Sequence, residues 1–123
     1  MLASASIVAF VATTDPERAK AFYGGVLGLP LVYQDDFAVV FDAHGTTLRV
    51  AIVPGIVVAP YTVLGWNVND IAAAARGLTE AGVQFERYPW MEQNELGIWN
   101  APGGAKVAWF KDPEGNVLSL SQL

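Results

Sequence analysis

The chain offers few side chains that could perform acid–base or metal chemistry. Among 123 residues there is no cysteine, and His44 is the only histidine; disulfides, thiolate metal sites and cysteine nucleophiles are therefore excluded. His44 stands in Ala43-His44-Gly45-Thr46, which is typical of an exposed hairpin turn and not of a general base. Glu92 and Glu95 would be candidate acids or bases if their segment folded over a cavity, although most such acids are surface groups.

Aromatic side chains gather in the second half of the chain. Trp90 and Trp99 flank a long irregular stretch, Trp109 follows in a predicted strand, and Tyr88 and Met91 are close in sequence. Large rings beside a flexible thioether are typical of a cavity that receives a flat apolar or aromatic ligand by stacking. The alternative is that these rings form ordinary core and dimer contacts. We select Trp90, Trp99 and Trp109 as candidate ligand-binding residues.

Arg49 is the charged residue that we consider the best candidate to bind a ligand. If its side chain points into a cavity, the guanidinium needs a partner, and a carboxylate or phosphate group of a ligand matches its planar fork. The alternatives are a pair with an internal acid such as Asp36 or Glu95, or an outward-facing position on an edge strand. The other polar candidates for the same site are Asn67, Ser119 and Ser121.

Composition limits the class of protein. Hydrophobic residues make up 53% of the chain and charged residues 15%, with a net charge of −5. This apolar content predicts one folded domain with a dimer interface, a ligand cavity or both. The acidic balance argues against nucleic-acid partners, and no apolar run approaches the roughly 20 residues that span a bilayer. We therefore expect a soluble, cytoplasmic protein without a membrane partner.

The elements that must position these side chains form two similar series. Asp15 and Asp70 each follow a short strand and cap a helix, and Gly28 and Gly82 each stand where a helix ends. Strands are predicted at 7–11, 31–34, 37–41 and 47–53, and again at 62–68, 83–87, 106–110 and 117–121. The pattern is a duplicated βαβββ module, roughly 5–53 and 62–122, and predicts an α+β fold whose two sheets enclose an open, barrel-like cavity.

Period-two alternation assigns faces within the predicted strands. In the last strand, Leu118 and Leu120 share one face, while Ser119 and Ser121 share the other. Trp66 alternates with apolar neighbours in the same way and is predicted to lie in the core.

Two motifs resemble a known family. They are Asp15-Pro16-Glu17-Arg18-Ala19-Lys20-Ala21-Phe22-Tyr23 with Leu27-Gly28-Leu29, and Phe110-Lys111-Asp112-Pro113-Glu114-Gly115-Asn116 with Leu118. In order and spacing they resemble the vicinal oxygen chelate superfamily, which includes glyoxalase I, bleomycin-resistance proteins and extradiol dioxygenases. The resemblance covers essentially the whole chain and implies the open-barrel fold. Together with the apolar composition, it leads us to expect a homodimer.

The resemblance also implies where a metal would be bound. Members similar to glyoxalase I hold a divalent metal with His and Glu at four equivalent strand positions, which here are occupied by Val8, Arg49, Val63 and Ser119. None of these is a carboxylate or an imidazole, so we expect no metal and no cofactor.

These observations favour a metal-independent protein that binds a small apolar or aromatic ligand, with or without an acidic group, and that is similar in kind to the bleomycin-resistance branch. The alternatives are a glyoxalase I-like lyase or isomerase or a dioxygenase of the same superfamily, a metal-free isomerase that uses Glu92 or Glu95, and a purely structural role.

Overall fold

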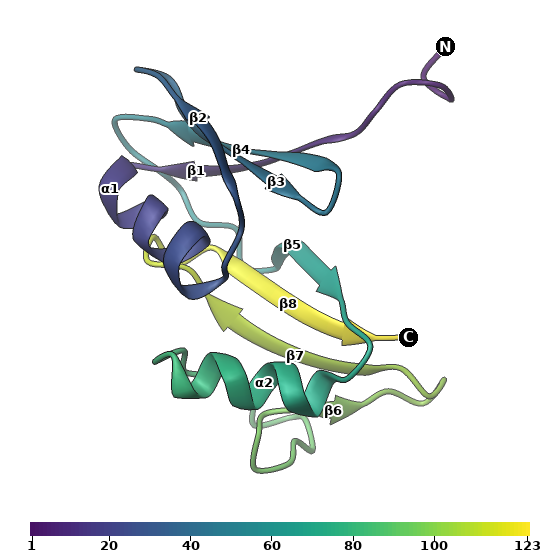
Figure 1. Ribbon diagram of the computed structural model, residues 1–123. Coiled ribbons are helices and arrows are strands. Elements are labelled where there is room, and N and C mark those ends of the chain that lie inside the picture. The colour runs from purple at the N-terminus through teal and green to yellow at the C-terminus, as the bar shows by residue number, and fades with distance from the viewer. The chain divides into compact units, whose positions relative to one another are not determined.

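The structure is a computed structural model that describes residues 1–123. The chain divides into two compact units, Met1–Val57 and Val58–Leu123. Each unit has one four-stranded mixed sheet and one helical segment. Figure 1 labels these strands and helices. The predicted α+β class is confirmed. No helix is long and apolar enough to cross a membrane.

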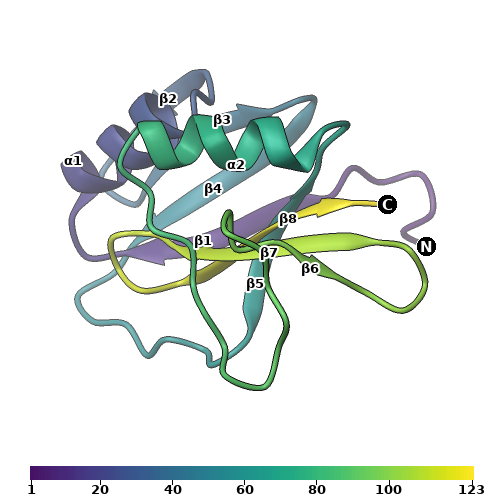
Figure 2. The same ribbon diagram turned by 90° about the horizontal axis from the view of Figure 1, so that it is seen from below.

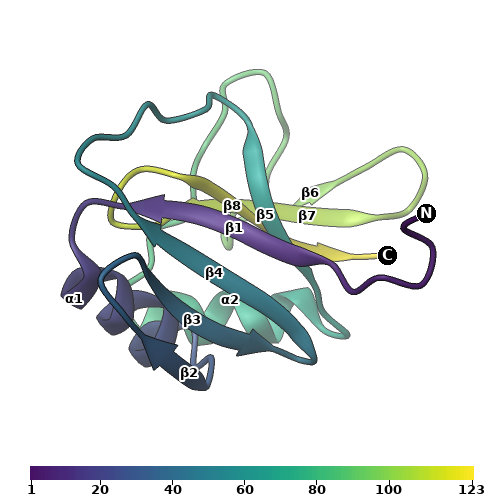
Figure 3. The ribbon, with the colours of Figure 1, turned by 90° about the horizontal axis from the view of Figure 1, so that it is seen from above.

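In the first unit, the helical segment follows the first strand and precedes the second along the chain. The strand order is β1-β4-β3-β2, with β1 parallel to β4 and the other pairs antiparallel, and Figure 3 shows these strands side by side. The elements are β1 (Val8–Thr13), α1 (Pro16–Ala19), the π-helical segment η1 (Lys20–Val26), β2 (Leu31–Gln34), β3 (Ala38–Ala43) and β4 (Thr46–Ile52).

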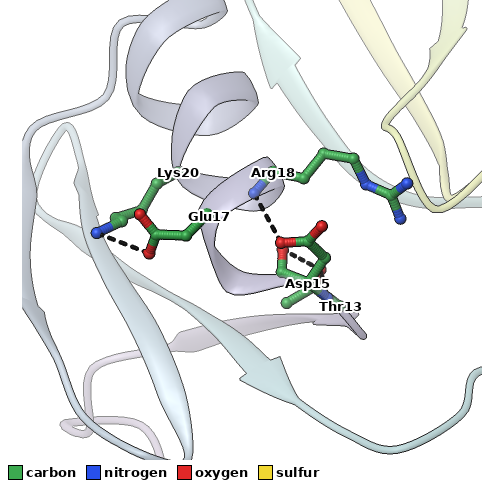
Figure 4. A network of polar contacts seen from close by, with 5 residues as sticks. All are labelled: Thr13, Asp15, Glu17, Arg18 and Lys20. Carbon is green, nitrogen blue, oxygen red and sulfur yellow. Dashed lines mark hydrogen bonds and ion pairs between the residues drawn. The ribbon is translucent and has the colours of Figure 1, made fainter.

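The start of α1 is fixed by local polar contacts, which Figure 4 shows from close by. An Asp15 side-chain oxygen accepts the Arg18 backbone N–H at 3.1 Å, and Thr13 Oγ1 donates to the Asp15 carbonyl at 3.0 Å. Lys20 and Glu17 form an ion pair of 3.0 Å. The Asp15 contact satisfies one of the backbone N–H groups that a helix N-terminus otherwise leaves without a partner.

The single helix predicted after Asp15 widens in its second half. The Leu27 N–H donates to the Phe22 carbonyl five residues earlier, which is the π-helical pattern. Gly28 then has φ of +75°, as its predicted place at the helix end requires. The Tyr23 ring lies 6.1 Å from that of Phe41 on β3, so the helical segment covers one face of the first sheet.

The second unit repeats this plan with a longer loop. Its elements are β5 (Thr62–Asn67), α2 (Ile71–Glu80), β6 (Trp99–Asn100), β7 (Lys106–Lys111) and β8 (Val117–Gln122), in the sheet order β5-β8-β7-β6. Asp70 caps α2 by accepting the Ala73 N–H at 3.1 Å. Figures 1 and 2 show α2 beside one face of this sheet. The Gln122 side chain on that face accepts the Ile71 N–H at 3.0 Å.

The strand predicted at 83–87 is wrong. The Gln93 side-chain amide donates to the Glu86 carbonyl in this stretch and accepts from the N–H of Tyr88, just beyond it, both at 2.9 Å. Only the Glu86 N–H reaches β7, bonding to the Trp109 carbonyl at 2.8 Å. The fourth strand of the second sheet is instead β6.

Candidate functional site

One face of the second sheet carries five of the seven predicted ligand-binding residues. Ser119 lies between Gly65 on β5 and Trp109 on β7, and Ser121 lies between Asn67 on β5 and Val107 on β7. Trp99 on β6 pairs with Val107. Cross-strand partners share a face, and α2 covers the opposite one. We call this the serine face: Gly65, Asn67, Trp99, Val107, Trp109, Ser119 and Ser121.

A continuous row of rings borders the serine face. The Tyr88 ring lies 5.1 Å from that of Trp90 and, edge to face, 5.6 Å from that of Trp109. Trp109 continues to Trp99 at 6.1 Å. Trp90, at the outer end, is 75% exposed. We call these four rings the aromatic row: Trp90, Tyr88, Trp109 and Trp99. Through Tyr88, the row connects Trp90, the sixth predicted ligand-binding residue, to the serine face.

The loop that carries Trp90 is tied down by side-chain contacts to its own backbone. Gln93 Nε2 donates to the Gly97 carbonyl at 2.9 Å, in addition to its contact with Glu86. Arg87 donates to the carbonyl oxygens of Asn94 and Glu95. The outer end of the aromatic row is therefore positioned before any ligand arrives. Sequence reasoning did not select Gln93, since an isolated Gln in a polar loop carries no recognisable signal.

Arg49, the seventh predicted residue, lies in the first unit. It is on β4, between Phe10 of β1 and Val40 of β3, so the edge-strand alternative is wrong. Its Nη1 donates to the Tyr33 hydroxyl at 3.2 Å. Leu48 alternates with it and is buried on the face that α1 and η1 cover. The guanidinium thus occupies the other face of the first sheet, and its place in a common site remains a prediction.

The residues at the family's metal positions do not fit a divalent cation. Val8 and Val63 provide no donor atom, Arg49 brings a fixed positive charge, and Ser119 offers one neutral hydroxyl. Neither unit gathers three His, Asp or Glu side chains in an arrangement that could hold a metal. A metal-dependent step therefore has no support from these side chains.

The candidate acids and bases, His44, Glu92 and Glu95, are all exposed. His44 is exposed in the turn between β3 and β4 with φ of +52°, which confirms it as a turn residue. Glu92 and Glu95 are exposed on the loop. Glu92 and Trp99 both line a pocket of about 400 Å³, whose other residues are Gln93, Asn94, Ile98 and Asn100.

Tyr88 gives the aromatic row a dependence on pH. Burial, and then the charge of Glu86, raise the pKa of Tyr88 above its ordinary value of 10.0, against a smaller opposing effect of Lys111. The unfolded chain releases this proton first, so stability should fall as pH rises above about 10. Tyr88→Phe should remove this part of the fall, which denaturant unfolding of both proteins between pH 9 and pH 11 measures. Equal slopes for the two proteins would contradict it.

Comparisons with known proteins agree with the fold. The chain is 27% identical to a member of the glyoxalase/bleomycin resistance protein/dioxygenase superfamily from Sphaerobacter thermophilus, with a TM-score of 0.71 and coverage of 96% and 98% of the two chains. A bleomycin-binding protein complexed with bleomycin is 20% identical, with a TM-score of 0.75 and coverage of 98% and 99%. A lactoylglutathione lyase from Agrobacterium tumefaciens is 18% identical, with a TM-score of 0.74 and coverage of 97% and 93%.

The last two comparisons, which are below 25% identity, concern the fold alone. No protein with a curated description matches the chain. A family model, however, matches residues 5–120. This match spans both units and includes the two sequence motifs and every residue of the serine face except Ser121. The chain therefore belongs to the Glyoxalase/Bleomycin resistance protein/Dioxygenase superfamily.

Proposed function

We propose that this protein binds a small aromatic ligand without a metal. The observation that carries the proposal is the aromatic row beside the hydroxyl and amide groups of the serine face. Tilted and edge-to-face rings at 5–6 Å present a large apolar surface that favours a flat ligand. The polar groups of Asn67, Ser119 and Ser121 would contact the ligand's edge.

The side chains of this site favour binding over catalysis. The chain places apolar rings and neutral polar groups together, and this combination orients a ligand but supplies no strong acid, base or Lewis acid. The bleomycin-binding protein among its structural relatives supports this class of function. Arg49 would neutralise an acidic group on the ligand.

A pair of matched acids tests the proposal. 2-Naphthoate is flat and aromatic, whereas cyclohexanecarboxylate is apolar and carries the same charge but cannot stack. Saturation-transfer NMR and calorimetry should show that naphthoate binds with at least 10-fold higher affinity. Arg49→Ala should weaken naphthoate more than neutral 2-naphthamide. Equal affinities for the two acids, or no binding of either, would contradict the proposal.

The amount of metal that the purified protein retains distinguishes metal-independent binding from a metal-dependent enzyme activity. Protein purified without chelator, incubated with Zn²⁺, Ni²⁺, Mn²⁺ or Fe²⁺ and dialysed, should retain far less than one equivalent of metal. The reason is that the four family positions provide no imidazole or carboxylate. Stoichiometric retention would instead favour a glyoxalase-like lyase or a dioxygenase.

The proposed molecule is a homodimer. The first unit exposes large apolar side chains along its edge strand β2, where Leu31, Val32 and Tyr33 are between 47% and 59% exposed. An unpaired apolar edge of this kind favours association. Sedimentation equilibrium should give a mass near twice 13.2 kDa; a monomer at micromolar concentration would contradict it.

A further inference from the structure

A notch lies in the serine face where β5 passes Ser119. The residue opposite Ser119 is Gly65. A Cβ atom built on Gly65 would lie 2.5 Å from Ser119 Oγ, which is closer than such atoms approach. The bare backbone of Gly65 therefore allows the serine hydroxyl to lie over β5. An isolated Gly within a strand pattern is the sequence signal for such a close approach.

The Ser119 hydroxyl is unusual because it is enclosed and yet has no partner. Ser119 is only 8% exposed, and its Oγ makes no hydrogen bond in the structure. No buried side-chain oxygen or nitrogen in the chain is both sealed from solvent and unpaired. The Ser119 oxygen must therefore keep a narrow opening to solvent, next to the exposed backbone of Gly65.

This arrangement is confined to the second unit. In the first unit, the position on β1 that corresponds to Gly65 is Phe10, which lies opposite Arg49 on β4. Phe10 is 58% exposed, and Arg49 already bonds to Tyr33. The duplicated module has therefore kept the strand pairing but not the notch or the unpaired hydroxyl.

We propose that Gly65 and Ser119 form a hydrogen-bonding subsite for a carbonyl oxygen carried by the aromatic ligand. This inference rests on the proposed function, and it specifies the ligand further. Trp109 flanks Ser119 on the other side, so a ring that contacts Trp109 directs a substituent toward the hydroxyl. An enclosed donor without a partner favours a ligand that supplies the missing acceptor over an isostere that does not.

Two naphthoates of nearly equal shape test the subsite. 6-Acetyl-2-naphthoate carries a carbonyl oxygen, whereas 6-isopropyl-2-naphthoate has a methyl group in its place. Calorimetry on the wild type should show a preference of about 3- to 10-fold for the acetyl compound, as one neutral hydrogen bond provides. In Ser119→Ala the ratio of the two affinities should fall to about 1.

Gly65→Ala provides the complementary change. Its φ lies outside the left-handed region, so alanine fits the backbone, but the new Cβ displaces the Ser119 hydroxyl. This variant keeps the serine and should nevertheless lose the preference. Ser121→Ala, on the same strand and face, is the matched control and should retain it.

Three outcomes would overturn the inference in distinguishable ways. If wild type binds 2-naphthoate but shows equal affinity for the two substituted compounds, the subsite is wrong and the proposed function stands. A preference that survives in both Ser119→Ala and Gly65→Ala assigns the hydrogen bond elsewhere. If wild type binds none of the naphthoates, the proposed function fails and the subsite fails with it.

Discussion

Trp109→Leu is expected to weaken 2-naphthoate binding by at least 10-fold. Trp109 is the central ring of the aromatic row, in contact with both Tyr88 and Trp99, and its strand position places it beside Ser119. Leucine keeps an apolar side chain at this position but removes the flat surface and separates Tyr88 from Trp99. Calorimetric titration of both proteins measures the loss.

Trp66→Leu is the matched control for this substitution. Trp66 pairs with Leu120 of β8, on the face that α2 covers, so its removal should change naphthoate affinity by less than twofold. Circular dichroism checks that both variants are folded. If Trp109→Leu binds as wild type, or if Trp66→Leu loses as much affinity, the ligand does not bind on the serine face.

Asp112→Ala is expected to lower the free energy of unfolding of the second unit by about 3 kcal/mol. Asp112 is 6% exposed in the turn between β7 and β8. Its Oδ1 accepts the N–H groups of Glu114 and Asn116, both at 2.9 Å, and its Oδ2 accepts the Asn116 side-chain N–H at 2.8 Å. Alanine leaves these donors without their acceptor in a largely buried turn.

Tryptophan fluorescence measures this loss selectively, because all four tryptophans lie in the second unit. Asp36→Ala, an exposed aspartate in the first unit, is the control and should change stability by less than about 0.5 kcal/mol. An Asp112→Ala protein with the wild-type unfolding midpoint would show that the turn is held by its backbone alone. Because β8 carries Ser119 and Ser121, the same variant should also weaken ligand binding.

Local sequence signals predicted most of the fold correctly. Asp15 and Asp70 cap helices where their spacing indicated, and Gly28 and Gly82 have the positive φ values expected at helix ends. These features depend on neighbours within a few residues, and for that reason sequence reasoning reaches them. The strand predicted at 83–87 is wrong. The Glu86 carbonyl there bonds to the side chain of Gln93, a contact that no periodicity reveals.

The candidate site was likewise predicted only in part from local sequence patterns. Alternation along single strands was enough to place Ser119 and Ser121 on one face, opposite Leu118 and Leu120. The family resemblance located Arg49 and Ser119 at equivalent positions. The sequence alone also established the donor-poor character of the four family metal positions, since residue identity decides coordination chemistry.

Register between strands had to come from the tertiary structure. Which residue of β5 lies opposite Ser119 depends on how two strands far apart in the chain align, and a shift of one residue would exchange Gly65 for Leu64 or Trp66. Register also brings Trp99 and Trp109 to the same face, and the loop's hydrogen bonds bring Tyr88 and Trp90 into line with them. The sequence by itself determined which chemical groups are available. Pairing between distant strands decided that the Ser119 hydroxyl, the Gly65 backbone and the aromatic row lie close together.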